Sequence, residues 1–513
     1  MLNERFVLRV RVLAGVCLLV GAVIVGKLYY LQIVHGSEYA RTADSQQVEL
    51  KNPLLNRGSI YFSAKDGTVL TAATLQDVGT THSTSSGQAT HQRYYPGGSL
   101  AAQVLGFVAY NNDDVQKGRY GLERYYDSTL ARGGGDSYAN FFVQLFLGLA
   151  GTPQGEAGWG DVVTTIEPST EAELERTLAE YQSQWHPKLM GGIIMDPTTG
   201  EVVAMATSPT FDLNRFGKET SVSVFNNPNV ESVFEMGSII KPLTIAAGLD
   251  SGAITEETTY NDTGCIELDQ KKICNFDGKA RGVIPIQEIL SQSLNVGASF
   301  VATKMGPDIM RNYFLDHYKI GDETGIDLPG EIHGLVQNLK SPRQVEYDTA
   351  AFGQGVALTP VETVRALASL GNGGLLVTPH VVKAIQYDSG ITRALSWPEP
   401  QQILKPQTST AISRMLTKVV DTKLADGKLK LEHYSIAAKT GTAQVADPVN
   451  GGYYADRYLH SFFGYFPAFA PKYIVFLWAL EPTGAPFAAQ TWAPPFGKLV
   501  KFLINYYNIP PDR

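Results

Sequence analysis

Two residues near the middle of the chain have the types and spacing of a nucleophile and its base. Ser238 and Lys241 stand three positions apart in Ser-Ile-Ile-Lys, so a helix that begins near the serine places hydroxyl and amine on one face. A lysine held there, desolvated and near other cations, can lose its proton and act as a base. The pattern alone is weak, because roughly one or two matches arise by chance in such a chain. A helix cap followed by a surface lysine would look the same.

A second motif, Ser293-Leu-Asn295, follows further along the chain. The serine hydroxyl could relay a proton to a leaving group, and the asparagine amide could hold a substrate carbonyl. By itself the triplet is more often a loop or a helix cap.

A third motif, Lys439-Thr440-Gly441-Thr442, follows a strand-like segment at residues 434–438. The glycine allows close backbone approach of a ligand, as a strand edge that binds an extended peptide would require. The lysine supplies positive charge, and the threonine hydroxyls could bind a terminal carboxylate.

The elements that must position these motifs begin at about residue 161. Thr170 and Glu173 predict a capping box, and apolar residues at helical spacing extend the helix to Trp185. The later β-like segments are residues 192–196, 201–206, 460–466 and 473–480, and a last helix is expected near 496–504. This order predicts an α+β domain around an antiparallel sheet.

The preceding residues, 34–160, predict a smaller β-rich domain. They are rich in Gly, Thr and Tyr, with β-like runs at 58–61, 69–72 and 104–109. The apolar run at 141–150 is too short to cross a bilayer, so buried packing is expected, with membrane-surface contact as the alternative.

The N-terminal segment predicts an uncleaved membrane anchor at residues 12–33. Residues 12–26 carry no charge, and the segment is long enough if Lys27 reaches the interface or faces a partner helix. Arginines within residues 1–11 predict a cytoplasmic tail and an extracytoplasmic remainder. A cleaved signal peptide is the alternative, but no A-x-A-like site follows.

Cys265 and Cys274 flank a segment that resembles a short hairpin. Outside the cytoplasm they could form a cross-strand disulfide. Two buried free thiols fit the sequence equally well, so the pairing stays open.

Composition excludes some function classes. The 513 residues include 42 Lys and Arg against 50 Asp and Glu, a net charge of −8, which argues against nucleic acid as the main partner. No Cys/His cluster predicts a metal site, and no glycine-rich phosphate loop follows a strand, so no metal or cofactor is expected.

The three motifs occur in the order S-x-x-K, S-x-N, K-T-G, and in that order the sequence resembles the penicillin-recognising serine enzymes. Further runs resemble the transpeptidase domain of class B, monofunctional penicillin-binding proteins: residues 195–201, 324–331, 352–355 and 461–464. Others resemble that family's non-catalytic pedestal: residues 57–60, 95–97, 121–123 and 126–127.

The resemblance implies a penicillin-binding-protein/β-lactamase-like fold, with helices flanking the antiparallel sheet. Its domains would be a tail (1–11), an anchor (12–33), a pedestal (34–160) and a transpeptidase domain (161–513). The implied activity is a D,D-transpeptidase that cross-links peptidoglycan stem peptides during cell-wall synthesis, without a cofactor. β-Lactams would mimic the D-Ala-D-Ala end and acylate it.

The resemblance also implies residue roles. Ser238 would attack the carbonyl between the last two D-alanines with Lys241 as base, and the backbone N–H groups of Ser238 and Thr442 would stabilise the oxyanion. Ser293, with Lys439 nearby, would pass a proton to the leaving D-alanine. Thr440 and Thr442, beside Gly441, would bind its carboxylate, and Asn295 would orient the acyl chain.

The residues beside the first two motifs are more similar to the division (septal) type than to the elongation type. Implied partners are lipid-linked nascent glycan, a polytopic glycosyltransferase and division proteins, at a single-pass membrane position. The chain departs from the family in having Met236-Gly237 where Pro-Gly is usual, and in a short pedestal head. A β-lactamase or D,D-carboxypeptidase on the same triad, and a non-catalytic division scaffold, are the alternatives.

Overall fold

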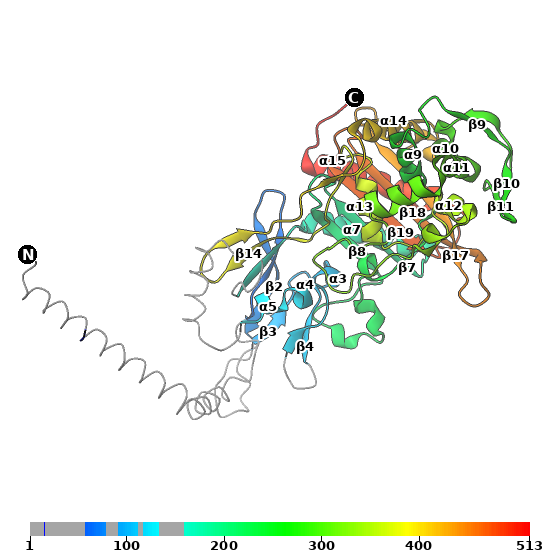
Figure 1. The fold of residues 1–513 in the computed structure, drawn as a ribbon. Helices are drawn as coiled ribbons and strands as arrows, with labels where there is room; N and C mark the ends of the chain where they lie inside the picture. Colours follow the sequence, from blue (N-terminus) through cyan, green and yellow to red (C-terminus); the bar gives the residue numbers. More distant parts are fainter. Residues whose placement is uncertain (1–14, 16–56, 78–90, 111–115, 133–158) are drawn as a thin grey trace, which may run out of the picture.

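The computed structural model describes residue 15 and residues 57–77, 91–110, 116–132 and 159–513 (Figure 1). Apart from Gly15, the predicted tail and anchor lie outside these residues, as does the apolar run at 141–150. No helix in the described ranges is both long and apolar enough to span a bilayer.

A five-stranded antiparallel sheet forms the centre of the larger part of the molecule, in the order β17-β18-β19-β7-β8. Its strands are β17 (Ala437–Ala446), β18 (Tyr453–Phe466), β19 (Tyr473–Leu480), β7 (Leu189–Met195) and β8 (Val202–Ser208). The central strands β19 and β7 are apolar and buried along nearly their whole length, as expected when both faces are covered. The expected α+β fold is therefore confirmed, and β17 lies at one edge of the sheet.

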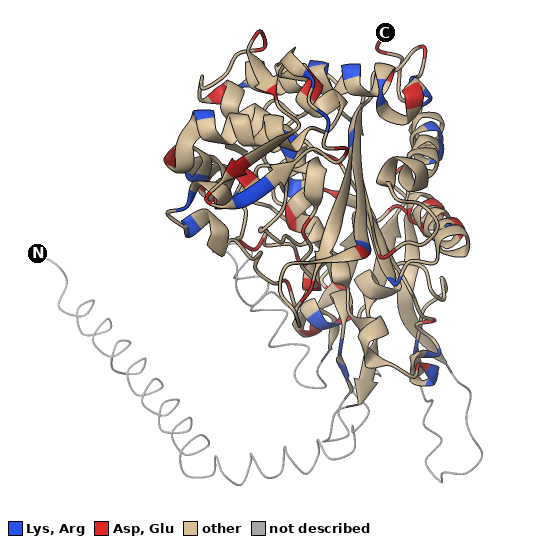
Figure 2. Cartoon of the chain, turned by 90° about the vertical axis from the view of Figure 1, so that its right-hand side faces the viewer, with Lys and Arg blue, Asp and Glu red and all other residues tan. Residues whose placement is uncertain are grey.

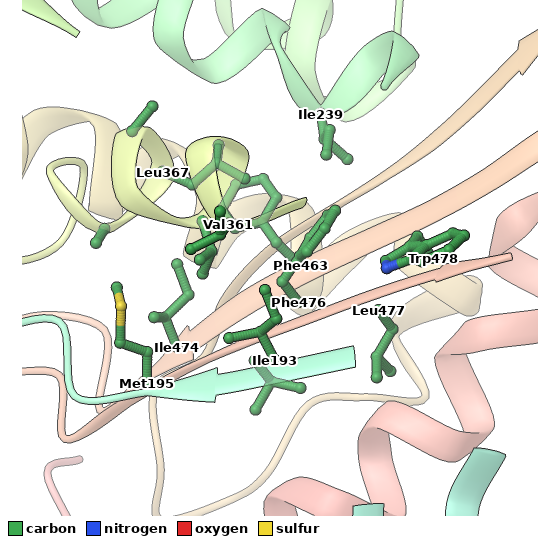
Figure 3. Packing of buried hydrophobic residues seen from close by; sticks show 14 of the residues in the cluster. Ile193, Met195, Ile239, Val361, Leu367, Phe463, Ile474, Phe476, Leu477 and Trp478 are labelled. Carbon is green, nitrogen blue, oxygen red and sulfur yellow. The ribbon is translucent and has the colours of Figure 1, made fainter. Parts of the chain in front are cut away.

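Helices cover both faces of this sheet. On one face, α7 (Pro168–Trp185) packs beside α15 (Ala488–Tyr507), and the rings of Tyr181 and Trp492 stack with centroids 3.8 Å apart. On the other, Figure 3 shows Val361 and Leu367 of α13 (Pro360–Ala368) lying over the strands, with Ile239 nearby. These buried aliphatic and aromatic side chains form the core that holds β17 in place.

The start of α7 differs from the predicted capping box. Pro168 occupies the first helical turn, and Glu167 is the cap, with its carboxylate accepting hydrogen bonds from the backbone N (2.7 Å) and Oγ1 (2.8 Å) of Thr170. The helix begins before Thr170 because proline at the first position is already set for it. The pairing of Thr170 with Glu173 is therefore wrong, although the helix itself is confirmed.

The remaining elements of the larger part lie around the sheet. Its other helices are α8 (Pro228–Glu231), α9 (Lys241–Asp250), α10 (Gln287–Ser291), α11 (Asn295–Arg311), α12 (Gln344–Ala350) and α14 (Pro406–Thr422). Its short strand pairs are β9 (Thr259–Asp262) with β12 (Gly282–Pro285), β10 (Cys265–Leu268) with β11 (Lys271–Cys274), and β13 (Leu375–Leu376) with β16 (Gln401–Gln402). On the face shown in Figure 2, acidic and basic residues are interspersed, without a large patch of one sign.

A second, six-stranded sheet has the order β15-β14-β6-β1-β2-β3. Four of its strands come from the N-terminal part: β1 (Ile60–Ser63), β2 (Val69–Asp77), β3 (His91–Tyr94) and β6 (Gly160–Thr164). The other two, β14 (Val382–Tyr387) and β15 (Thr392–Ala394), come from far along the chain. The predicted division between residues 160 and 161 falls inside β6, which pairs with β1 on one side and β14 on the other.

The run at 104–109 is not the single strand that its composition predicted. It is divided between helix α3 (Ala102–Leu105) and strand β4 (Val108–Tyr110), which pairs with β5 (Gln116–Gly118). Gly106 ends the helix at φ 66°, a conformation that a side chain would disfavour.

A buried charge cluster joins β1, β3 and the short helices α4 (Gly121–Tyr125) and α5 (Asp127–Leu130). Glu123 is fully buried and accepts hydrogen bonds from Arg57 Nε (2.7 Å) and Arg93 Nε (2.6 Å), while Arg57 also reaches Asp127 (2.8 Å). Burial alone would raise the pKa of Glu123, but the two guanidinium groups bring it below its ordinary value. The carboxylate therefore stays charged and is shared by two buried guanidinium groups, one of which also pairs with Asp127.

Candidate active site

The first motif brings its two side chains into contact. Ser238 lies in a 3-10 turn (Gly237–Ile239) immediately before α9, rather than in the helix itself, and Lys241 is the first residue of that helix. The lysine Nζ lies 3.0 Å from the serine Oγ. The expected i, i+3 contact is thus formed.

Lys241 is completely buried among neutral acceptors. Its Nζ also lies 2.6 Å from the carbonyl oxygen of Ser293 and 2.8 Å from Oδ1 of Asn295. Burial lowers the pKa of the Lys241 amine well below its usual value, and the nearby positive charge of Lys439 is a second, smaller cause. An amine in this environment is available as a base for the Ser238 hydroxyl.

Asn295 is already engaged through both ends of its amide. Its Oδ1 accepts from Lys241, and its Nδ2 donates to the carbonyl oxygen of Cys274 (2.9 Å). The amide thereby fixes the position of the lysine. Its expected contact with an acyl chain stays a prediction.

Ser293 connects the two lysines of the site. It adopts φ 57°, a left-handed conformation that is uncommon for a residue with a side chain. Its Oγ lies 3.3 Å from Lys241 Nζ and accepts a hydrogen bond from Lys439 Nζ at 3.0 Å. A proton could therefore pass between the amines through this hydroxyl.

The third motif lies inside β17 and not after a strand at 434–438, because β17 begins only at Ala437. Lys439 is buried, and burial lowers the pKa of its amine to about 7. The backbone of Gly441 lies so close to its neighbours that a Cβ there would stand 2.3 Å from Ser461 Oγ and 2.6 Å from the carbonyl oxygen of Met236. This glycine lets the strand approach the residues before Ser238, as well as any ligand.

A cleft of about 1010 Å³ opens in front of these residues. Five of the eight predicted site residues line it: Ser238, Ser293, Asn295, Thr440 and Thr442. Lys241, Lys439 and Gly441 stand behind its surface, in contact with those five. Because β17 is an edge strand, its unpaired side can accept an extended peptide as an additional strand.

Comparison with known proteins agrees with this geometry. Residues 190–497 match the model of the penicillin binding protein transpeptidase domain. The chain belongs to this family.

Solved structures and curated relatives of this penicillin-binding family resemble the chain over most of its length. The crystal structure of penicillin binding protein 3 from Mycobacterium tuberculosis, complexed with aztreonam, superposes with a TM-score of 0.76 at 25% identity, covering 89% of this chain and 97% of that one. Stage V sporulation protein D of Bacillus subtilis is 30% identical over 432 residues, 82% of this chain. The probable peptidoglycan D,D-transpeptidase PenA of Neisseria gonorrhoeae is 28% identical, covering 82% of this chain and 70% of that protein. The alignment spans 65% of the length of the Bacillus protein.

The hairpin of β10 and β11 borders the cleft of this penicillin-binding domain. Cys265 and Cys274 pair across it and form a disulfide, which answers the question that their spacing left open. Cys274 lines the cleft, and its carbonyl oxygen holds Asn295.

Motif reasoning missed other residues that line the cleft. Phe276 and Phe487, whose ring centroids are 5.9 Å apart in an edge-to-face contact, line it, as does Gln354. Only Gln354 lay in a run that the family resemblance had marked; the aromatic residues come from segments without a chemical motif. Among the described residues, no group of three or more His, Cys, Asp or Glu side chains could hold a metal ion.

Proposed function

We propose that the chain is a peptidoglycan D,D-transpeptidase that works through an acyl-Ser238 intermediate, in the manner of the division type. The observation that carries the proposal is the buried Lys241 amine, 3.0 Å from Ser238 Oγ, behind a cleft bounded by a free strand edge. A buried amine of lowered pKa accepts the hydroxyl proton as the oxygen attacks a carbonyl carbon.

The remaining residues complete an acyl transfer. The C–N bond to the terminal D-alanine breaks as its nitrogen takes a proton by way of Ser293 and Lys439. Backbone N–H groups of Ser238 and Thr442 are the expected oxyanion donors; each such donor is typically worth about 3–4 kcal/mol. An amine of a second stem peptide then attacks the acyl-enzyme and takes the acyl group.

One feature of the cleft favours transfer over hydrolysis. Glu346 is the only carboxylate among the described residues that line it, and it lies 3.5 Å from Lys271 and 3.4 Å from Arg343. A deacylating water needs a carboxylate free to orient it and accept its proton, whereas Glu346 is already engaged with two cations. The acyl-enzyme should therefore persist until an amine arrives.

A fluorescent penicillin tests this proposal. We expect stoichiometric labelling, with the label mapped by mass spectrometry to the peptide that contains Ser238, and an acyl-enzyme that survives for many minutes. Protein unfolded in denaturant before labelling is the control and should stay unlabelled. Label on another residue would contradict the assignment, and release within seconds would instead indicate a β-lactamase.

We further propose that residues 12–33 anchor the chain in the cell membrane, with the N-terminus cytoplasmic and the catalytic domain outside. The segment would also bind a polytopic glycosyltransferase that delivers lipid-linked glycan. Lys27 supports this, because a cation within an apolar helix costs about 2.5–3.5 kcal/mol at the centre of the bilayer unless it finds a partner.

Exchanging residues 1–33 for an unrelated membrane anchor tests the partnership. We expect the chimera to keep penicillin labelling but to lose co-purification with the glycosyltransferase and to fail to support growth. A chimera that still co-purifies and supports growth would show that the segment is only a tether.

A further inference from the structure

The hairpin between β17 and β18 extends beyond the core that holds the rest of the sheet. Figure 1 shows it projecting from the body of the molecule. Side chains from Tyr453 to Arg457 are mostly exposed, and continuous burial begins only at Leu459. Gly451 and Gly452 both have positive φ angles, and the register shifts between Gln444 and Ala446. Core packing therefore does not fix the outer half of this hairpin.

One side chain connects the hairpin to the nucleophile segment. The hydroxyl of Tyr453 donates a hydrogen bond to Oε2 of Glu235 at 2.8 Å. Glu235 stands three positions before Ser238. Tyr453 pairs with Ala446 across the two strands, so the contact acts at the outer end of β17.

The second oxygen of Glu235 binds another chain segment that lines the cleft. Its Oε1 accepts a hydrogen bond from the backbone N of Gly355 at 3.1 Å. Burial raises the pKa of this carboxyl, and the hydrogen bonds from Tyr453 and Gly355 partly offset that rise. We call Glu235, Tyr453 and Gly355 together the hairpin tether.

Two of the three residues of the hairpin tether form part of the cleft wall. Tyr453 and Gly355 line the cleft together with Gln444, whereas Glu235 is not among the described residues that line it. Ala446 lies four residue steps beyond Thr442 along the strand, about 14 Å at 3.4 Å per residue. The strand end that Tyr453 holds therefore lies beyond Thr442, where the edge of β17 would meet the part of a ligand beyond the scissile bond.

We infer that the hairpin tether is a positioning device that holds the outer half of β17 in place for the acyl side chain of the donor. Glu235 and Tyr453 would then determine specificity for the acyl substituent without acting on the reaction at Ser238. The nucleophile is held independently, because Ser461 Oγ donates to the carbonyl oxygen of Met236 at 2.8 Å. The inference rests on the proposed acylation of Ser238.

Two acylating agents separate this role from a general structural one. 6-Aminopenicillanic acid has no acyl side chain, whereas benzylpenicillin carries a phenylacetyl group. We would measure the second-order rate of Ser238 acylation by mass spectrometry in Tyr453→Phe and Glu235→Gln. Loss of one hydrogen bond to a carboxylate should lower the rate of acylation by benzylpenicillin about fivefold to tenfold. The rate of acylation by 6-aminopenicillanic acid should fall less than twofold.

Tyr454→Phe is the matched control. Tyr454 is the next residue of the same strand, does not line the cleft, and bonds through its hydroxyl to Asp447 within the hairpin. Its ratio of the two rates should stay at the wild-type value. Equal slowing of both compounds by Tyr453→Phe, or no change in either, would overturn the inference. Wild-type protein that neither compound acylates would overturn the proposed function, and the inference with it.

Discussion

Replacing Lys241 with alanine is expected to slow acylation of Ser238 by about 10²–10⁴-fold, the usual contribution of a general base. The amine is buried and lies 3.0 Å from the serine Oγ, and no carboxylate of the described residues forms an ion pair with it. Without it, the hydroxyl must lose its proton to solvent. The measurement is the rate of covalent labelling by benzylpenicillin under pseudo-first-order conditions.

The pH dependence distinguishes loss of a base from loss of structure. In Lys241→Ala the residual rate should rise about tenfold per pH unit, because hydroxide replaces the missing base. Ser238→Ala is the reference variant and should show no labelling at any pH. If Lys241→Ala labels within about threefold of wild type, another group is the base.

The second large effect concerns stability. Replacing Glu123 with alanine should destabilise the N-terminal part by about 3–5 kcal/mol, because it leaves the buried guanidinium groups of Arg57 and Arg93 without their shared carboxylate. The measurement is the urea concentration at which β1 and β3 unfold, followed by hydrogen exchange of their backbone amides. A lower midpoint would show the loss of stability.

The matched control for Glu123 is Glu180→Ala. Glu180 also binds two cations, Arg176 and Lys498, but at the surface, where such pairs contribute about 1 kcal/mol or less. Equal destabilisation by the two substitutions would contradict the role assigned to the buried cluster.

The clustering of the candidate site residues was predictable from sequence because each motif is a short run of residues at fixed spacing. The contact between Ser238 and Lys241 follows from their spacing of three positions. The other site residues were predicted from the order of the three motifs and the family resemblance that this order carries. The errors were local as well: a proline shifted the start of α7, and the strand that carries Lys439 begins later than its apolar residues suggested.

Features that depend on distant pairing could not be predicted. Cys265 and Cys274 are bonded because the register of the hairpin sets their Cα atoms 4.1 Å apart. The sequence spacing of two cysteines does not by itself predict that register. The Glu235 contact with Tyr453 joins residues 218 positions apart. No local pattern marks such a pair, because only the folded sheet brings the two side chains together.

The shared six-stranded sheet has a consequence for how such genes can change. The strands β1, β2, β3 and β6 come from the N-terminal part of the chain. The strands β14 and β15 follow much later in the sequence, after the first two motifs and before the third. A single crossover that exchanged one relative's N-terminal part for another's would place foreign strands against the resident β14. Backbone pairing would tolerate this, but the side chains packed on both faces would not match. We therefore expect recombinants to persist only where the exchanged segment carries both contributions to the sheet.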